Sequence, residues 1–124
     1  MPTSRITLDG LKMRVVTTAT SGVVSADTVF EFQQQGMVVT ARYAGGRIMA
    51  GFLAGKWEKG RLPFRYVQVT NDGAVESGRS VGHVSRLPDG RVRLEEHFQW
   101  ESKQGSGTNV FEEIPIVSRR KSRS

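Results

Sequence analysis

The sequence predicts an all-β protein, a single eight-stranded antiparallel up-and-down barrel. Three observations in the 124-residue chain support this fold class. Apolar and polar residues alternate along most of the chain, so that within 91–100 Val92, Leu94 and Phe98 share one face of a strand. Glycine-containing turns separate the alternating segments, and no segment of helical length keeps a helical period. A fold of alternating strands and helices is therefore excluded.

The turns divide the chain into eight candidate strands. The second and third are β-branched and aromatic runs separated only by Gln35-Gly36, which is a hairpin signal. Later turns place Asn or Asp next to Gly, as in Asn71-Asp72-Gly73 and Pro88-Asp89-Gly90, because these residue types tolerate positive φ. The expected strands are 11–19, 28–35, 37–43, 47–57, 61–70, 74–87, 91–102 and 108–117.

Closure into a barrel follows from the number and order of these strands. An open meander of this length would leave two unpaired edges, and closing the sheet removes both. Gly46, Gly51 and Gly55 lie in or beside one expected strand, where they favour the bends that a small barrel needs. A two-sheet sandwich is the alternative architecture. An eight-stranded barrel has an interior that side chains fill or that holds one small ligand.

The length, cysteine content and charge of the chain bear on its domain organisation and on the kinds of site that it can contain. It has the size of one domain, for which we expect a flexible N-terminus at 1–10, a barrel at 11–117 and a basic disordered tail at 118–124. The absence of cysteine excludes disulfides and thiolate metal sites. Four of the six net positive charges lie in the tail, so we expect only non-specific nucleic-acid contact there. We find neither a membrane span nor a signal peptide and expect a cytoplasmic protein.

From about Ser25 to Ile114 the chain resembles a family of small, uncharacterised bacterial proteins with an avidin-like, calycin-type barrel, some of which carry an acetylglutamate synthase label. The matching residues are Thr28-Val29-Phe30, Tyr43-Ala44-Gly45-Gly46, Ile48, Gly51, Leu53, Gly55, Arg65-Tyr66, Gly78, Pro88 to Leu94, Glu96, Trp100 and Glu112-Glu113. The chain departs from the family pattern at Phe98, where Trp is frequent, and at Val67-Gln68, where Gln-His is frequent. The resemblance implies an eight-stranded barrel.

Motifs of familiar enzymes do not fit this chain. Residues 78–82 match GxSxG, with Asp89 and His97 downstream, but no helix follows the serine. The glycines near Lys56 lack the spacing of a phosphate-binding loop. His83 and His97 are the only histidines, and His97 falls on the outer face of its strand, so we expect no metal site and no cofactor.

Glu96 is the most informative residue, because it shares the inward face of its strand with apolar neighbours. A buried carboxyl group is costly unless it is paired or hydrogen-bonded. One interpretation is a carboxyl group that contacts a ligand or acts as an acid or base, with a perturbed pKa. The other is a structural ion pair. Its candidate partners are Arg42, Arg65 and Arg79.

Other residues would complete a lumen with polar and aromatic groups. A mixture of phenol, amide and carboxyl groups on an apolar background is typical of small-ligand pockets. The candidate ligand-binding residues are Tyr43, Tyr66, Gln68, Arg79, Glu96, Phe98, Trp100 and Glu112. The choice between Glu112 and Glu113 depends on strand phase, and Val110 with Ile114 favours an inward Glu112. Trp57 would cover one end of the barrel or anchor an interface.

Three functions fit these residues. The first is a barrel that binds a small molecule, and the second is a small lyase, isomerase or cyclase with Glu96 as acid or base and Tyr66 as hydrogen-bond donor. The third is a scaffold with a filled core. Spare apolar residues at Val67, Val69 and either Val110 or Phe111 also predict a homodimer.

Overall fold

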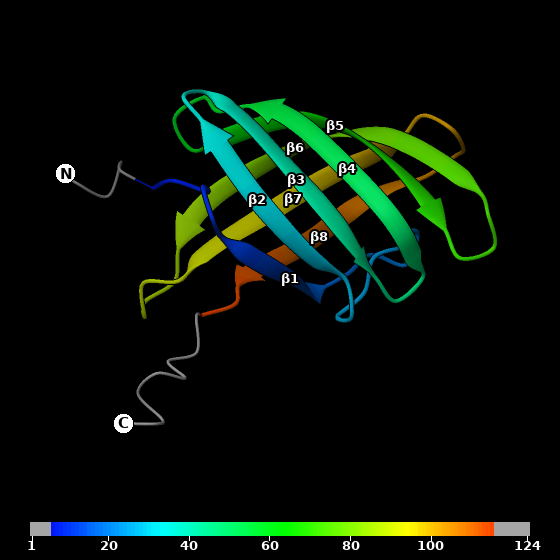
Figure 1. The fold of residues 1–124 in the computed structure, drawn as a ribbon, viewed down its shortest axis with the longest axis horizontal. Helices are drawn as coiled ribbons and strands as arrows, with labels where there is room; N and C mark the ends of the chain where they lie inside the picture. Colours follow the sequence, from blue (N-terminus) through cyan, green and yellow to red (C-terminus); the bar gives the residue numbers. More distant parts are fainter. Residues whose placement is uncertain (1–5, 116–124) are drawn as a thin grey trace.

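The computed structural model describes residues 6–115, which form a closed barrel of eight antiparallel strands (Figure 1). The strands are β1 (Lys12–Thr17), β2 (Val29–Gln35), β3 (Val38–Gly45), β4 (Ile48–Lys56), β5 (Arg61–Thr70), β6 (Val75–Arg86), β7 (Val92–Trp100) and β8 (Ser106–Glu113). Each strand pairs with the next, and β1 pairs with β8, so the predicted up-and-down barrel is confirmed and the sandwich alternative is wrong.

The residue types in the turns determine where the hairpins form. Gly36, between β2 and β3, has φ 63°, and Gly90, between β6 and β7, has φ 92°; glycine adopts this left-handed region without steric cost. Asp89 supports the second turn by accepting a hydrogen bond from the Arg91 amide at 3.0 Å. The predicted strand positions therefore hold to within a few residues at each end.

The N-terminal segment that the structure describes, residues 6–11, packs against the barrel, within and just after the 1–10 stretch expected to be flexible. Leu8 is fully buried, and its amide donates to Gln34 Oε1 at 2.9 Å. The Gln34 amide in turn donates to Asp9 Oδ1 at 2.9 Å. Apolar burial and two reciprocal bonds hold residues 8 and 9 against β2. Residues 1–5, residues 116 and 117 of the last expected strand, and the basic tail at 118–124 lie outside the described part of the chain.

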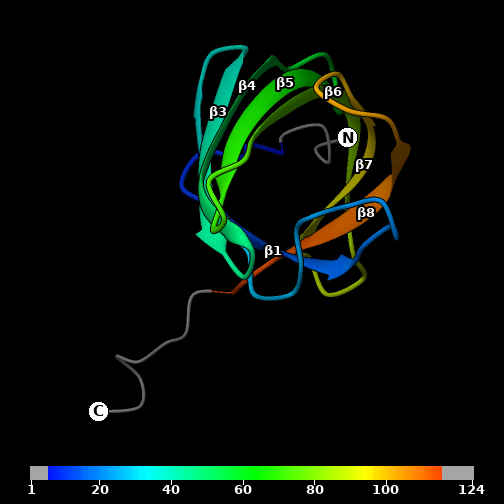
Figure 2. The ribbon, with the colours of Figure 1, turned by 90° about the vertical axis from the view of Figure 1, so that its right-hand side faces the viewer.

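The barrel interior differs between its two ends. The end toward the N-terminal segment, called here the apolar end, is filled by hydrocarbon and phenyl side chains. These are Leu8, Met13, Phe32, Val39, Leu62, Val92, Leu94 and Phe111. The other end, called the polar end, lies beneath the loop at residues 18–28 that connects β1 to β2 (Figure 2). Its buried polar residues are Thr28, Gln68, Thr70, Ser80, Glu96 and Asn109.

Two tyrosines of the interior lie over glycines on the neighbouring strand. Tyr43 of β3 is paired with Gly51 of β4, and Tyr66 of β5 is paired with Gly78 of β6. A Cβ atom on Gly51 would overlap the Tyr43 ring, and one on Gly78 would overlap the Tyr66 hydroxyl group. These glycines therefore let two large rings lie flat within a narrow barrel.

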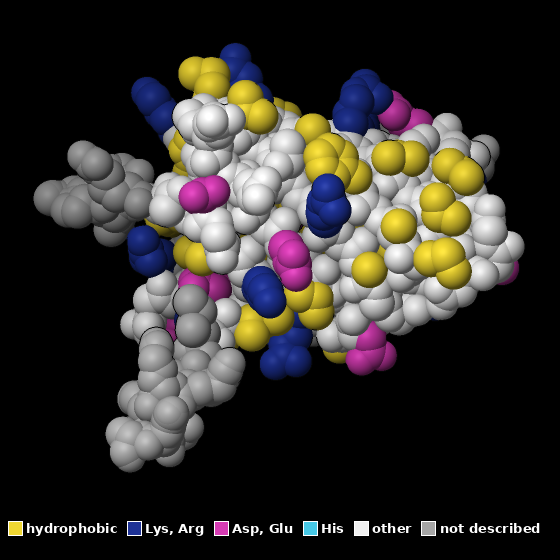
Figure 3. All heavy atoms as spheres, in the orientation of Figure 1, with side chains coloured by type: hydrophobic (Ala, Val, Ile, Leu, Met, Phe, Trp, Pro, Cys, Tyr) yellow, Lys and Arg dark blue, Asp and Glu magenta, His cyan; other side chains and the backbone are white. Residues whose placement is uncertain are grey.

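The outer surface carries an apolar region on β3, β4 and β5. Phe52 is 44% exposed and its cross-strand partner Val67 is 46% exposed. Figure 3 shows apolar side chains gathered over this part of the sheet. Phe111, by contrast, points inward, so of the two alternatives named from the sequence only Val110 belongs to the outer face. No helix long enough to cross a membrane occurs within residues 6–115.

Candidate functional site

The polar end of the lumen brings together most of the residues selected from the sequence. Tyr43, Tyr66, Gln68, Glu96, Phe98 and Trp100 are all buried and line one cavity of about 30 Å³. Gly22, Val23 and Val24 of the 18–28 loop close the cavity from above. Pockets for drug-sized ligands usually have volumes of several hundred Å³. The lumen therefore has space for a group of about the size of water.

Glu96 is held by neutral groups and not by an arginine. Ser80 Oγ donates to Glu96 Oε2 at 2.6 Å, and Asn109 Nδ2 donates to Glu96 Oε1 at 3.0 Å. Burial raises the pKa of Glu96, although these two hydrogen bonds oppose the shift. The site therefore favours the protonated, uncharged form of this carboxyl group at higher pH than usual.

The ion-pair interpretation of Glu96 is wrong. Arg42 is exposed on the outer face of β3. Arg65 Nη1 lies 2.6 Å from Glu101 Oε1, and Arg79 donates to Gln99 Oε1 at 3.2 Å, both on the outside. In the structure all three arginines are exposed and alternate with the buried residues of their strands, so they lie on the outer face, away from the lumen.

Tyr66 is the one polar side chain of the described residues that is buried without a hydrogen-bond partner. Its ring packs edge-on against Trp100, with the ring centroids 5.5 Å apart. Burial raises the pKa of the Tyr66 hydroxyl well above its usual value, and the negative charge that Glu96 carries when it is ionised is the next cause. The hydroxyl is therefore a neutral donor that has no acceptor among residues 6–115.

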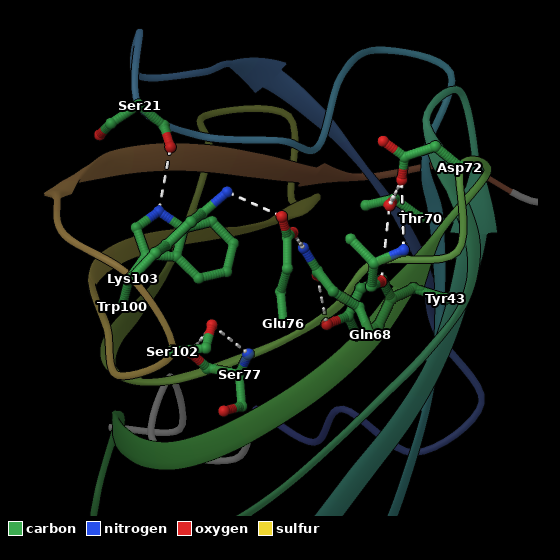
Figure 4. A network of polar contacts seen from close by, with 11 residues as sticks. Ser21, Tyr43, Gln68, Thr70, Asp72, Glu76, Ser77, Trp100, Ser102 and Lys103 are labelled. Carbon is green, nitrogen blue, oxygen red and sulfur yellow. Dashed lines mark hydrogen bonds and ion pairs between the residues drawn. The ribbon is translucent and has the colours of Figure 1, made fainter.

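Tyr43, in contrast, begins a continuous chain of hydrogen bonds (Figure 4). Its hydroxyl donates to Gln68 Oε1 at 2.8 Å, and Gln68 Nε2 donates to Glu76 Oε1 at 3.0 Å. Glu76 Oε2 accepts from Lys103 Nζ at 2.8 Å. The chain links the lumen to the turn between β7 and β8, where the Lys103 ammonium lies 4.4 Å from the centroid of the Trp100 ring.

Partial burial and hydrogen bonding have opposite effects on Glu76. Partial burial works to raise its pKa, but the hydrogen bonds from Lys103 and Gln68 outweigh it and hold the pKa below its usual value. Glu76 therefore stays ionised while Glu96, deeper in the same end of the barrel, favours the neutral form. The two carboxyl groups have separate electrostatic environments.

Two of the predicted ligand-binding residues lie away from the lumen. Arg79 points outward, as described above. Glu112 also points outward, because the inward residue of this part of β8 is Phe111, which is 1% exposed. Glu112 Oε1 instead lies 3.3 Å from Arg91 Nη1, and Glu113 accepts a hydrogen bond from the Val92 amide at 2.9 Å. The phase suggested by Val110 and Ile114 was wrong.

Several residues of the site were missed from the sequence. Ser80 and Asn109 bind Glu96, and Glu76 and Lys103 complete the chain from Tyr43. Ser80 shares the inward face of β6 with Gly78 and Gly82, and this run has no apolar pattern from which its face could be read. Asn109 could have been found from an inward Phe111, two residues away on β8. Trp57 is half-buried and packs against the core.

The chemical capacity of this site is narrow. Within the described lumen one carboxyl group, one unpaired phenol and two amides face a background of aromatic rings. No group of three or more His, Cys, Asp or Glu residues in residues 6–115 could hold a metal ion. The arrangement is therefore suited to orient a small molecule by hydrogen bonds inside an apolar pocket.

Fold and site together define a closed, eight-stranded up-and-down barrel with a polar and aromatic group cluster at one end. A family described as Avidin-like protein matches residues 6–114, and the chain belongs to this family. The match covers nearly the whole described barrel and agrees with the resemblance noted in the sequence. Neither a curated protein nor a solved structure matches the chain.

Proposed function

We propose that the polar end of the lumen binds a small, neutral, mostly apolar molecule that carries a hydrogen-bond acceptor. Membership of the avidin-like family supports a ligand inside the barrel. The aromatic walls formed by Phe30, Phe64, Phe98 and Trp100 favour a planar apolar body. The buried, largely uncharged lumen disfavours a charged ligand, because burying an unpaired charge is expensive.

The observation that carries this proposal is the unpaired Tyr66 hydroxyl. A buried hydroxyl without a partner costs free energy, so a ligand carbonyl that accepts a hydrogen bond from it recovers that cost. Such a ligand is larger than the closed cavity of about 30 Å³, so it must displace part of the 18–28 loop, beginning with Val23.

The test compares two probes of similar shape, acetophenone and ethylbenzene, by thermal unfolding and intrinsic tryptophan fluorescence. We expect acetophenone to raise the melting temperature more than ethylbenzene, because only acetophenone offers an oxygen to Tyr66. The variant Tyr66→Phe should bind the two probes alike. Native mass spectrometry of the purified protein would show in addition whether a molecule of this class is already bound.

A scaffold with a filled core is the second candidate, and the small cavity volume favours it. In that case neither probe changes the melting temperature, and no molecule accompanies the protein in native mass spectrometry. An equal response to both probes, unchanged in Tyr66→Phe, would also contradict the proposed role of the hydroxyl. A bound compound that is turned over would instead support Glu96 and Tyr66 as catalytic groups.

We also propose that the chain forms a homodimer through the apolar surface of β3, β4 and β5. Phe52 and Val67 lie side by side there, and exposed apolar patches commonly mark interfaces. Light scattering at high micromolar concentration should give twice the monomer mass. Val67→Lys should give a monomer, whereas Val16→Lys should not, because Val16 is 48% exposed on β1, which pairs with β2 and β8 and lies outside this surface.

A further inference from the structure

The loop at residues 18–28 is attached to the barrel differently from the strands. Its internal backbone hydrogen bonds are short-range, from the Gly22 amide to Ala19 O and from the Thr28 amide to Ser25 O, both at 2.9 Å. Between Thr18 and Asp27 only Val23 is buried, and the other residues are exposed or half-buried. A segment with few buried side chains and no ladder hydrogen bonds opens at low cost.

Three hydrogen bonds involving side chains hold residues 19–21 of this loop over the polar end, and a fourth, from Thr28 Oγ1 to Gly45 O at 3.0 Å, fixes the other end of the loop to β3. Trp100 Nε1 donates to Ser21 O at 3.0 Å, and Ser21 Oγ donates to Ser106 O at 2.8 Å. The Ala19 amide donates to Asn109 Oδ1 at 3.2 Å. Trp100 and Asn109 also line the lumen cavity, so two of the three attachments come from the site itself (Figure 4 shows that of Trp100).

Asn109 connects the loop to Glu96 through one amide group. Its oxygen accepts from the Ala19 amide, while its nitrogen donates to Glu96 Oε1. The side chain is 4% exposed, so neither end has water as a ready alternative partner. Loss of the bond at one end therefore frees the amide to turn and weakens the bond at the other.

The backbone of β8 provides the seat for the loop. A Cβ atom on Gly107 would lie 2.5 Å from Ala19 Cβ, which is closer than two carbon atoms can approach. The glycine thus lets the start of the loop rest directly on the strand that carries Asn109. Any side chain at this position would lift the loop from the barrel.

We propose that loop 18–28 is the lid through which a ligand reaches the lumen, and that Asn109 couples its closed position to the hydrogen bonding of Glu96. The lid role rests on the proposed function. With the lid closed, the Ala19 amide fixes the Asn109 amide so that its nitrogen faces Glu96. By reciprocity, any change that removes the acceptor at Glu96 loosens the lid.

The first experiment measures amide hydrogen exchange across residues 18–28 in the full chain without ligand. Glu96→Leu removes the acceptor of Asn109, and exchange in the loop should accelerate about tenfold, as expected for the loss of one hydrogen bond. Glu96→Gln keeps an acceptor for Asn109 and should exchange like the wild type. Ser80→Ala is the matched control, because it removes the other hydrogen bond of Glu96 without affecting Asn109.

Equal loop exchange in Glu96→Leu and the wild type would overturn the coupling. The same acceleration in Ser80→Ala would also overturn it, since the effect would then come from general loosening of the core. The acetophenone comparison is independent of these results. Loss of probe binding with a coupled loop rejects the proposed function alone, and probe binding with an uncoupled loop rejects the coupling alone.

The second experiment opens the lid from its seat. Gly107→Ala, made in a Trp57→Phe background so that Trp100 is the only tryptophan, should increase quenching of Trp100 fluorescence by acrylamide several-fold. Ser21→Ala is the milder variant if Gly107→Ala does not fold, because it removes one attachment outside the lumen. Unchanged quenching in both variants would show that the loop does not cover Trp100 as a lid.

Discussion

The two ends of the barrel interior use the same strands for different purposes. At the apolar end, Leu8, Met13 and Leu62 are fully buried and leave no polar group to satisfy. At the polar end, Glu96 and Asn109 are also buried but are held by individual hydrogen bonds. A folded barrel of this size requires only the first kind of packing. The polar groups at the other end therefore reduce stability and point to a functional role there.

The largest difference between the ends should appear on truncation. Phe111→Ala at the apolar end should lower the free energy of unfolding by about 3–5 kcal/mol, because it leaves a cavity in packed hydrocarbon. Ser80→Ala at the polar end should cost about 1–3 kcal/mol, since it removes one of two hydrogen bonds to Glu96. Urea denaturation measures both. A larger loss in Ser80→Ala would mean that the polar end carries the stability.

A second prediction concerns the glycine beneath Tyr66. Gly78→Ala should destabilise the protein by about 1–3 kcal/mol, because the new Cβ would meet Gln99 O at 2.5 Å and would overlap the Tyr66 hydroxyl. Gly82→Ala on the same strand is the matched control. Its Cβ would meet Leu94 Cδ2 at 3.1 Å, and a flexible side chain can move away, so thermal unfolding should show a smaller loss. Equal losses would contradict the close approach at Gly78.

The pH dependence of stability tests the state of Glu96. Its pKa is raised in the folded protein, so folding is favoured below the usual glutamate pKa of about 4.3, and that contribution is lost as pH rises toward the folded pKa. The slope within this window is at most about 1.4 kcal/mol per pH unit. Glu96→Gln should abolish it.

Glu76 gives the opposite sign. Its pKa is lowered, so its contribution is present above the usual glutamate pKa and is lost as pH falls. The two effects are separated by measuring denaturation midpoints of the wild type, Glu96→Gln and Glu76→Gln from about pH 3 to about pH 8. A wild-type slope that survives in Glu96→Gln would show that another group produces it.

The sequence predicted the architecture because strand alternation and turn glycines are local signals. The inward positions of Tyr43, Tyr66 and Glu96 follow from the same alternation and are correct. The predicted inward position of Glu112 was wrong, since Val110 and Phe111 are adjacent apolar residues and the sequence allows either to face the core. The predicted lumen position of Arg79 was wrong for a similar reason, because the glycines and serine around it form no apolar pattern that tells which face of the strand is buried.

The partners of Glu96 were not predicted, because identifying them requires the register between neighbouring strands in addition to the inward face of each strand. Asn109 is 13 residues away in sequence and reaches Glu96 across the β7–β8 ladder. Loop 18–28 has no periodic pattern, so nothing local indicated that Val23 would cover the lumen. A ligand-binding site built by long-range contacts is visible only in the folded chain. The roles of the site residues in binding remain predictions.

The most direct test of the account compares the two tyrosines of the polar end. Tyr43→Phe removes the donor to Gln68 Oε1 and should cost about 1 kcal/mol in the free energy of unfolding. Tyr66→Phe removes a buried hydroxyl that has no partner, so stability should stay unchanged or increase. Urea denaturation of both variants beside the wild type measures the difference. If Tyr66→Phe lost as much stability as Tyr43→Phe, its hydroxyl would already be satisfied in the free protein, and the claim that it is reserved for a ligand would be wrong.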